Sequence, residues 1–287
     1  MKSKHIIGFI LASLIFSTTT VNSDTYFGER ETEGFTDICP RDDVVLVEES
    51  RNGLFKVTIS RTEDFTCHFV VVSFDGKTMF QDSIMGGYFY LGANYEANGE
   101  PFATLTGPGH QNVVISSWSG GAHCCFTLRI FDVTDGFRQA AYIDSGNFMA
   151  VFEDLDFDGI PEIKVTDDFL AYQFSSFAES ATADVVLKYS EGEFIVAPEF
   201  MLKAPLDLRL LRNEITEWRR QIREANDLGN LPYSFMKTVT DLTFSGNWQT
   251  AEQLVELTWP SEGPSKKDFL IRYEMALAES KFYTKLL

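Results

Sequence analysis

Hydrophobic and polar positions follow two different periods along this chain, and the change falls near residue 200. Before it, short runs of β-branched and aromatic residues are separated by Gly, Asp and Ser, which is typical of strands joined by turns. The runs that predict strands are residues 44–49, 54–60, 67–74, 112–118, 125–133 and 184–189. We expect this part of the chain to form antiparallel sheets.

After residue 200 the apolar positions recur every three or four residues, as on one face of an amphipathic helix. The residues on this face of the first predicted helix are Leu211, Ile215, Trp218, Ile222 and Ala225. We expect the helix to begin near Pro205 and to end near Gly229. Further helices are expected over residues 232–244 and 248–257. A last one begins near Ser265, where Asp268 resembles part of a capping box.

The two periods predict an α+β protein with an N-terminal antiparallel β domain and a small C-terminal helical domain. The β domain is expected either as propeller-like blades or as a sandwich. Residues 198–205, with a proline at each end, mark the junction. The predicted division is therefore a signal peptide at 1–23, the β domain at 24–200 and the helical domain at 201–287.

A faint repeat runs through the β domain. Three times an apolar strand is followed by an acidic turn with glycine and a second strand, and the glycines Gly76, Gly136 and Gly192 lie 60 and 56 residues apart. This spacing suits multi-stranded blades. Plain hairpin turns in any antiparallel sheet remain the alternative.

The N-terminus has the order of a secretory signal peptide: Lys2 and Lys4, an apolar run over residues 6–16, and small residues up to Ser23. This run of eleven residues would span only about 16 Å as a helix, too little for a hydrocarbon core of about 30 Å. We therefore expect cleavage before Asp24, no membrane span in the mature chain, and a periplasmic or secreted protein.

The net charge of −18 limits the kinds of partner that this chain is expected to bind. Residues 24–200 hold 30 acidic and 10 basic residues, whereas residues 201–287 hold 12 of each. Because nucleic-acid binders present a basic face, the acidic balance argues against a nucleic-acid partner.

Export would place the four cysteines Cys39, Cys67, Cys124 and Cys125 in an oxidising compartment, where disulfides persist. The neighbours Cys124 and Cys125 either bond to separate partners or to each other. We favour Cys39–Cys67 with a vicinal pair. A zinc site is the weaker alternative, because the chain has no C-x₂-C pair.

An acidic string over residues 153–162 is the sharpest chemical signal. Asp154, Asp156 and Asp158 stand at positions 1, 3 and 5 of a loop, the carbonyl of Ile160 at position 7 and Glu162 at position 9. Oxygen ligands in this order suit Ca²⁺. Position 12 is Val165, where an EF-hand needs Glu, so this is not an EF-hand.

The string resembles the D-x-D-x-D-G calcium loops of FG-GAP repeats, as in integrin α chains. The resemblance covers residues 152–166 and implies that the loop joins two strands of a propeller blade. It carries over the same five ligands and implies a structural Ca²⁺. This chain has one complete loop, where the family has several.

Two further strings carry weaker predictions. The turn with Gly120, Gly121 and His123 next to two cysteines favours a structural or ligand-contacting turn over a Cys–His nucleophile or a soft metal site. Residues 242–254 resemble the middle of a tetratricopeptide unit, in which Ala251 allows close helix packing and Trp248 fills the turn. A generic helical hairpin packed on the β domain is the preferred alternative.

These features predict an exported Ca²⁺-binding protein that acts as a binding module for a protein or glycan at the cell envelope or outside the cell. No catalytic residue is assigned. The alternative is a secreted hydrolase that uses carboxylates or His123 on the β scaffold.

Overall fold

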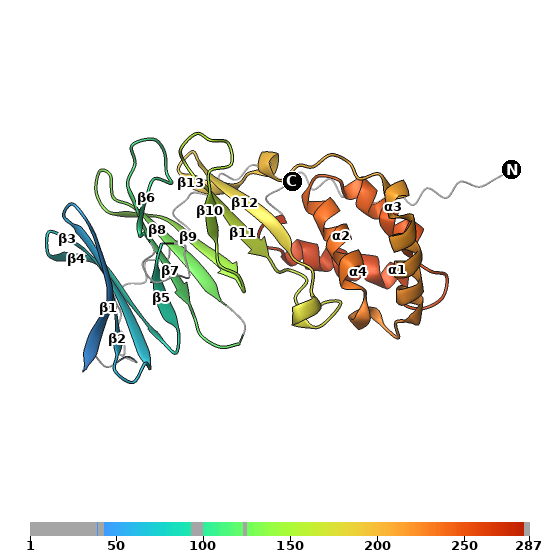
Figure 1. The fold of residues 1–287 in the computed structure, drawn as a ribbon, viewed down its shortest axis with the longest axis horizontal. Helices are drawn as coiled ribbons and strands as arrows, with labels where there is room; N and C mark the ends of the chain where they lie inside the picture. The colour runs from blue at the N-terminus through green and yellow to red at the C-terminus, as the bar shows by residue number, and fades with distance from the viewer. Residues whose placement is uncertain (1–38, 40–42, 93–99, 123–124, 284–287) are drawn as a thin grey trace, which may run out of the picture. The chain divides into compact units, whose positions relative to one another are not determined.

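The computed structural model describes residue 39 and residues 43–92, 100–122 and 125–283. Within these residues, three antiparallel sheets are followed by four α-helices, in the order of the sequence (Figure 1). This arrangement confirms the predicted α+β class with a small helical C-terminal part. The predicted signal peptide at 1–23 lies outside the described residues and stays a prediction.

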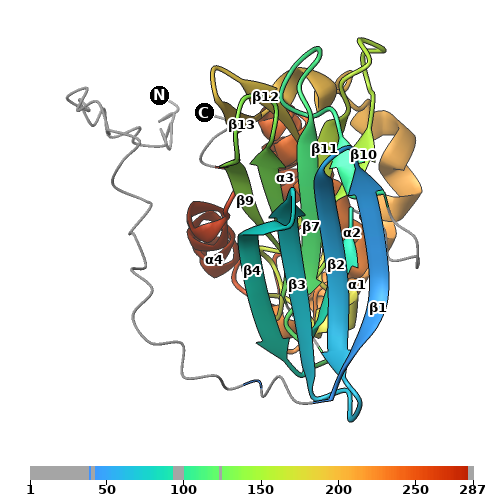
Figure 2. The ribbon, with the colours of Figure 1, turned by 90° about the vertical axis from the view of Figure 1, so that its left-hand side faces the viewer.

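Each sheet is built from strands that are neighbours in the sequence. Sheet A contains β1 Val44–Asn52, β2 Phe55–Thr62, β3 Cys67–Phe74 and β4 Lys77–Met85, which lie side by side in Figure 2. Sheet B contains β5 Tyr88–Leu91, β6 Phe102–Ala103, β7 Asn112–Trp118, β8 Phe126–Asp132 and β9 Arg138–Gly146. Sheet C contains β10 Val151–Glu153, β11 Glu162–Asp167, β12 Ala183–Ser190 and β13 Glu193–Val196. The helices are α1 Arg212–Glu224, α2 Tyr233–Phe244, α3 Trp248–Thr258 and α4 Lys266–Glu279.

The three glycine turns of the sequence repeat occupy the same place in the three sheets. Gly76 lies between β3 and β4, Gly136 between β8 and β9, and Gly192 between β12 and β13, the last two strands on each sheet's path. All three have positive φ, at +77°, +148° and +98°, which glycine adopts without strain. The sequence repeat therefore coincides with a repeat in topology.

Sheet B is buried on both faces. Val113 and Ile115 of β7 belong to an apolar cluster with Val57 and Val70 of sheet A. Val114, between them, belongs to a second cluster that continues through sheet C into the helices. Because successive side chains of a strand point to opposite faces, β7 is apolar at every position of this stretch.

Sheet C lies between sheet B and the helices. β9 contacts β11 and β13, and α2 contacts β12. Val185 and Val186 are neighbours on β12, and both are buried in the cluster that also holds Phe235 of α2 and Phe269 of α4. One apolar cluster thus extends across residues 198–205, where the change of secondary structure falls, and the domain boundary proposed there stays a prediction.

The first helix, α1, matches its predicted apolar face but is shorter than the limits expected from Pro205 and Gly229. The expected limits near Pro205 and Gly229 are wrong, because aspartates stabilise tight turns at both ends. Before α1, Asp207 Oδ1 accepts a hydrogen bond from Arg209 N at 3.0 Å. After α1, Asp227 Oδ1 accepts one from Gly229 N at 2.7 Å. The other three helices lie close to their predicted limits.

The α2–α3 hairpin confirms one packing expectation and corrects another. Ala251 is buried at 4 % exposure, as close helix packing requires. Trp248, expected to fill the turn, is 52 % exposed. The turn residue Gly246 has φ +78°, and a Cβ there would lie 2.7 Å from Leu202 Cδ2. Leu202, from the segment before α1, therefore lies against the turn that Trp248 was expected to fill.

A disulfide joins Cys39 to Cys67, the first residue of β3, as predicted. Both cysteines are buried and pack with Phe69 in a small apolar cluster. Cys125 is also disulfide-bonded. Its predicted vicinal partner, Cys124, lies outside the described residues, so that pairing stays a prediction.

Replacing Cys39 and Cys67 together by alanine should lower the free energy of unfolding by about 2–4 kcal/mol. The bond closes a loop across a sequence separation of 28 residues, and losing it restores chain entropy to the unfolded state. Denaturant unfolding of the double variant and the wild type measures the difference. An unchanged free energy of unfolding contradicts the prediction.

A buried carboxylate ties the end of α4 to sheet C. Asp167, the last residue of β11, is 3 % exposed and accepts hydrogen bonds from the Ser280 hydroxyl and from Phe169 N. Burial raises the pKa of Asp167 above its ordinary value, and the Ser280 hydrogen bond acts in the opposite direction. Ser280 Oγ also accepts from Tyr283 N at 2.8 Å, so the residues after α4 are held to the same point.

The raised pKa of Asp167 predicts how stability depends on pH. Between the unfolded and folded pKa values the native state binds the extra proton, so this residue's contribution is present at low pH and is lost as pH rises through the folded pKa. Asp167→Asn should remove this loss of stability with rising pH. Asp184→Asn, at an exposed position on β12, should keep it. Melting temperatures of both variants across pH 4–7 measure it. A decline identical in Asp167→Asn and wild type contradicts the prediction.

Candidate metal centre

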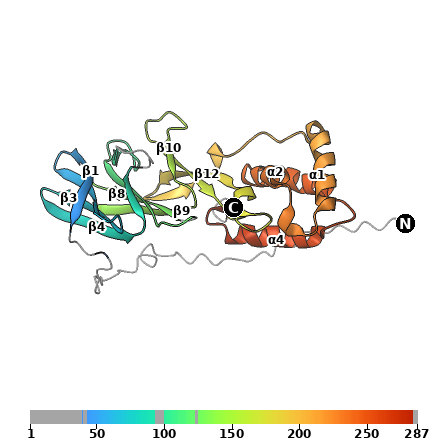
Figure 3. The ribbon, with the colours of Figure 1, turned by 60° about the horizontal axis from the view of Figure 1, so that its bottom comes forward.

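The acidic string of the sequence forms the loop between β10 and β11, the first two strands of sheet C. Figure 3 shows the loop extending away from the strand pair next to the β10 label. The two strands pair over only three residue pairs, from Val151–Lys164 to Glu153–Glu162. The loop therefore depends on its own side chains for much of its order.

Three carboxylates of the loop converge. Asp154, Asp156 and Glu162 each present an oxygen, and these oxygens all lie within 4.8 Å of one another. Glu162 is buried at 5 % exposure, Asp154 is half-buried and Asp156 is exposed. The group thus reaches from the surface to the first residue of β11.

Backbone N–H groups hold these carboxylates in place. Asp154 accepts hydrogen bonds from Asp158 N at 3.2 Å and from Gly159 N at 3.0 Å. Glu162 Oε2 accepts from Leu155 N at 2.8 Å, across the loop. Gly159 has φ +87°, so the tight return of the chain uses a conformation that other residues rarely adopt. The turn that the sequence assigned to this glycine is present.

The other two predicted ligands, Asp158 and the carbonyl of Ile160, are not among these three carboxylates. Asp158 is not one of the three converging carboxylates, and its Oδ1 accepts a hydrogen bond from Ile160 N at 2.7 Å. An aspartate that binds its own backbone two residues on forms a local turn. Asp158 and the Ile160 carbonyl therefore stay predicted ligands, while Asp154, Asp156 and Glu162 are brought together.

The charge of the group is not balanced by a side chain. Glu153, just before the group, forms an ion pair with Lys164 at 2.8 Å. Among the described residues, no ion pair involves Asp154, Asp156 or Glu162. The buried Glu162 carboxylate has a hydrogen bond from Leu155 N, but no basic side chain offsets its charge or the charges of the two aspartates beside it. Several hard oxygen atoms at one point are the ligands that Ca²⁺ and Mg²⁺ prefer, so the residues fit a hard divalent cation.

The glycine turn that the sequence singled out is a close approach of two chain segments. A Cβ at Gly120 would lie 2.1 Å from Gly86 O, so no other residue fits there without movement of the chain. Ser119 and Cys125 close the turn, with Ser119 Oγ accepting from Cys125 N at 2.7 Å. Gly121 also has positive φ, at +97°. His123 lies outside the described residues, so its proposed contact with a ligand stays a prediction.

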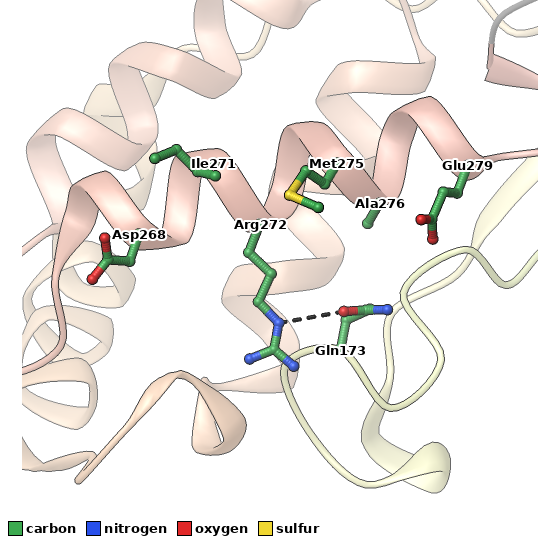
Figure 4. Close-up of a pocket in the computed structure, with 7 residues that line it drawn as sticks. All are labelled: Gln173, Asp268, Ile271, Arg272, Met275, Ala276 and Glu279. Atoms are coloured by element: carbon green, nitrogen blue, oxygen red, sulfur yellow. Dashed lines mark hydrogen bonds between the residues drawn. The ribbon is translucent and has the colours of Figure 1, made fainter.

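A shallow pocket of about 220 Å³ lies along α4 (Figure 4). Arg272 Nε donates a hydrogen bond to Gln173 Oε1 at 3.3 Å, and the guanidinium lies 5.2 Å from the ring centroid of Phe174. Ile271 and Met275 line the pocket and are 46 % and 61 % exposed. This pocket brings together no group of metal ligands.

No family model, curated protein or solved structure matches this chain significantly. Among the described residues, no helix has both the length and the apolar character needed to cross a bilayer.

The unbalanced charge of the three carboxylates predicts how the free energy of unfolding changes when one of these charges is removed in the absence of metal. In the presence of EDTA, Glu162→Gln should raise the free energy of unfolding by about 1–2 kcal/mol, because it removes one of three like charges whose oxygens lie within 4.8 Å of one another, while the amide oxygen still accepts from Leu155 N. Denaturant unfolding measures the change. Glu153→Gln, which removes an exposed carboxylate paired with Lys164, is the control and should show no such gain. A clear loss of stability in Glu162→Gln contradicts the prediction.

Proposed function

We propose that this chain is an exported Ca²⁺-binding protein in which the ion holds the β10–β11 loop, and that the protein acts by binding a protein or glycan at the cell envelope or outside the cell. The observation that carries the metal proposal is the buried Glu162 beside Asp154 and Asp156, without a basic partner among the described residues. A divalent cation would replace the mutual repulsion of these carboxylates by attraction.

Calcium fits this group better than the other common divalent ions. Zinc prefers nitrogen and sulfur ligands, and the group offers only carboxylates. Magnesium demands a near-octahedral shell and keeps several waters, whereas calcium accepts six to eight oxygens in irregular geometry. A loop that supplies carboxylates, a backbone carbonyl and water suits calcium.

The topology supports the resemblance to the FG-GAP calcium loop. That resemblance implies a loop between two strands of a blade, and the loop here joins the first two strands of a four-stranded sheet. The three sheets also share the position of their glycine turns. The proposed role of the ion is structural, because it would link a surface loop to the buried start of β11.

The disulfide chemistry supports export. The Cys39–Cys67 bond and the bonded state of Cys125 agree with an oxidising compartment, which the predicted signal peptide at 1–23 also requires. The periplasm and the extracellular space both meet this condition.

The metal proposal is tested by thermal unfolding in Ca²⁺ and in EDTA. At a Ca²⁺ concentration about 100 times the Kd, binding adds about 2.7 kcal/mol, which corresponds to a rise in melting temperature of about 5–10 °C for a chain of this size. Asp156→Ala should abolish the rise, because it removes one of the three converging ligands.

The control is Asp135→Ala, which removes one exposed carboxylate from the β8–β9 hairpin turn and should keep the rise. A melting temperature that does not respond to Ca²⁺ in the wild type would refute the structural site. A rise that persists in Asp156→Ala would place the ion elsewhere.

A further inference from the structure

A second site candidate lies between sheets A and B, away from the metal loop. A pocket of about 350 Å³ opens between β4 of sheet A and the face of sheet B formed by β7, β8 and β9. We call it the inter-sheet pocket; its lining includes Asp82, Ser117, Thr127, Arg129, Tyr142 and Asp144. Its volume is near the lower end of the range for small-ligand sites.

The fixed charges of the inter-sheet pocket cancel. Arg129 Nη2 lies 3.0 Å from Asp82 Oδ2, and both side chains are about three-quarters buried, at 26 % and 22 % exposure. Asp144 pairs with Lys281 at 2.8 Å. The pocket therefore offers no unpaired charge, so a neutral ligand fits it better than an anion or a cation.

The walls nevertheless keep hydrogen-bonding capacity. Among the described residues, Asp82 is the sole ionic or hydrogen-bonding partner of the Arg129 side chain, which leaves most of the five guanidinium N–H donors for a ligand. The hydroxyls of Ser117 and Thr127 lie 2.6 Å apart and share one hydrogen bond, so one O–H remains to donate. An apolar ligand would leave these groups unpaired at a cost in free energy.

An aromatic side chain completes the pocket. Tyr142 is 50 % exposed, and the Arg129 guanidinium carbon lies 5.2 Å from its ring centroid and 5.3 Å from that of Phe80. These contacts fix the guanidinium between the two sheets. The exposed ring of Tyr142 offers a flat surface of negative partial charge to C–H groups of a ligand.

A sugar is a neutral ligand that accepts from a guanidinium, donates to a carboxylate and presents C–H groups to an aromatic ring. Each sugar hydroxyl can both donate and accept, so one hydroxyl can donate to Asp82 while its neighbour accepts from Arg129, both in charge-assisted hydrogen bonds. We propose that the inter-sheet pocket binds one neutral hexose residue, with Asp82 and Arg129 contacting adjacent hydroxyls and Tyr142 packing on the ring. This inference rests on the proposed binding function and gives that function a ligand class. The inter-sheet pocket uses none of the metal ligands.

Saturation-transfer NMR of the full chain with D-glucose, D-galactose, D-mannose and N-acetyl-D-glucosamine tests the proposal. At least one sugar should receive saturation from the wild type. Asp82→Asn and Tyr142→Ala should each weaken its binding by about tenfold or more, as expected for the loss of a charged hydrogen bond or of the packing surface. Tyr233→Ala, at a similarly exposed tyrosine on α2, is the matched control and should bind as the wild type does.

Melting temperatures of the variants show whether they fold. If Asp82→Asn does not fold, Tyr142→Ala still tests the proposal, because Tyr142 is half-exposed and its side chain can be removed without disturbing a buried core. Transfer from none of the four sugars overturns the proposal, as does equal binding in the wild type and Tyr142→Ala. Transfer from a charged probe such as N-acetylglutamate instead of the sugars overturns it too. Asp156→Ala should bind the sugar normally while losing the response to Ca²⁺, so the two proposals fail separately.

Discussion

Sheets B and C both bury apolar side chains on two faces, and this burial determines how the layers are ordered. Side chains of β7 alternate between the cluster shared with sheet A and the cluster shared with sheet C and the helices. A sheet that is apolar on both faces must be covered on both faces, so sheets A and C are required on either side of sheet B. Sheet C carries the same requirement, and the four helices satisfy it. The order of these layers follows the order of the sequence (Figure 1).

This layering explains why the candidate metal centre and the inter-sheet pocket lie where they do. Glu162 is buried because it begins β11 within an inner sheet, and the loop before it brings two aspartates to the same point. A cation there would join a surface loop to the layered core. The inter-sheet pocket lies at the seam of sheets A and B, where Arg129 crosses to Asp82 instead of an apolar contact. Polar groups at a seam remain partly solvated, which makes them available to a ligand.

The sequence predicts those features that depend on neighbouring residues. β3 and β7 match their predicted limits at both ends, because strand alternation and turn residues are local signals. β5, β6 and β10 lie outside the predicted runs, because strands of two to four residues show little alternation. The equally short β13 is predicted only through the repeat of glycine turns. Loop spacing predicted Asp154, Asp156 and Glu162 as one group, but the burial of Glu162 and the separate place of Asp158 arise only on folding. The pairing of Asp82 with Arg129 joins two sheets and has no local signal.

The central claim is that carboxylates of the β10–β11 loop hold a calcium ion between the surface and the start of β11. Hydrogen-exchange mass spectrometry of the full chain, in Ca²⁺ and in EDTA, tests it at the site itself. Ca²⁺ should slow amide exchange across residues 153–162, where backbone N–H groups bond to the carboxylates, and should leave exchange in the β8–β9 turn unchanged. Exchange across the loop that is equally fast with and without Ca²⁺ would contradict the account.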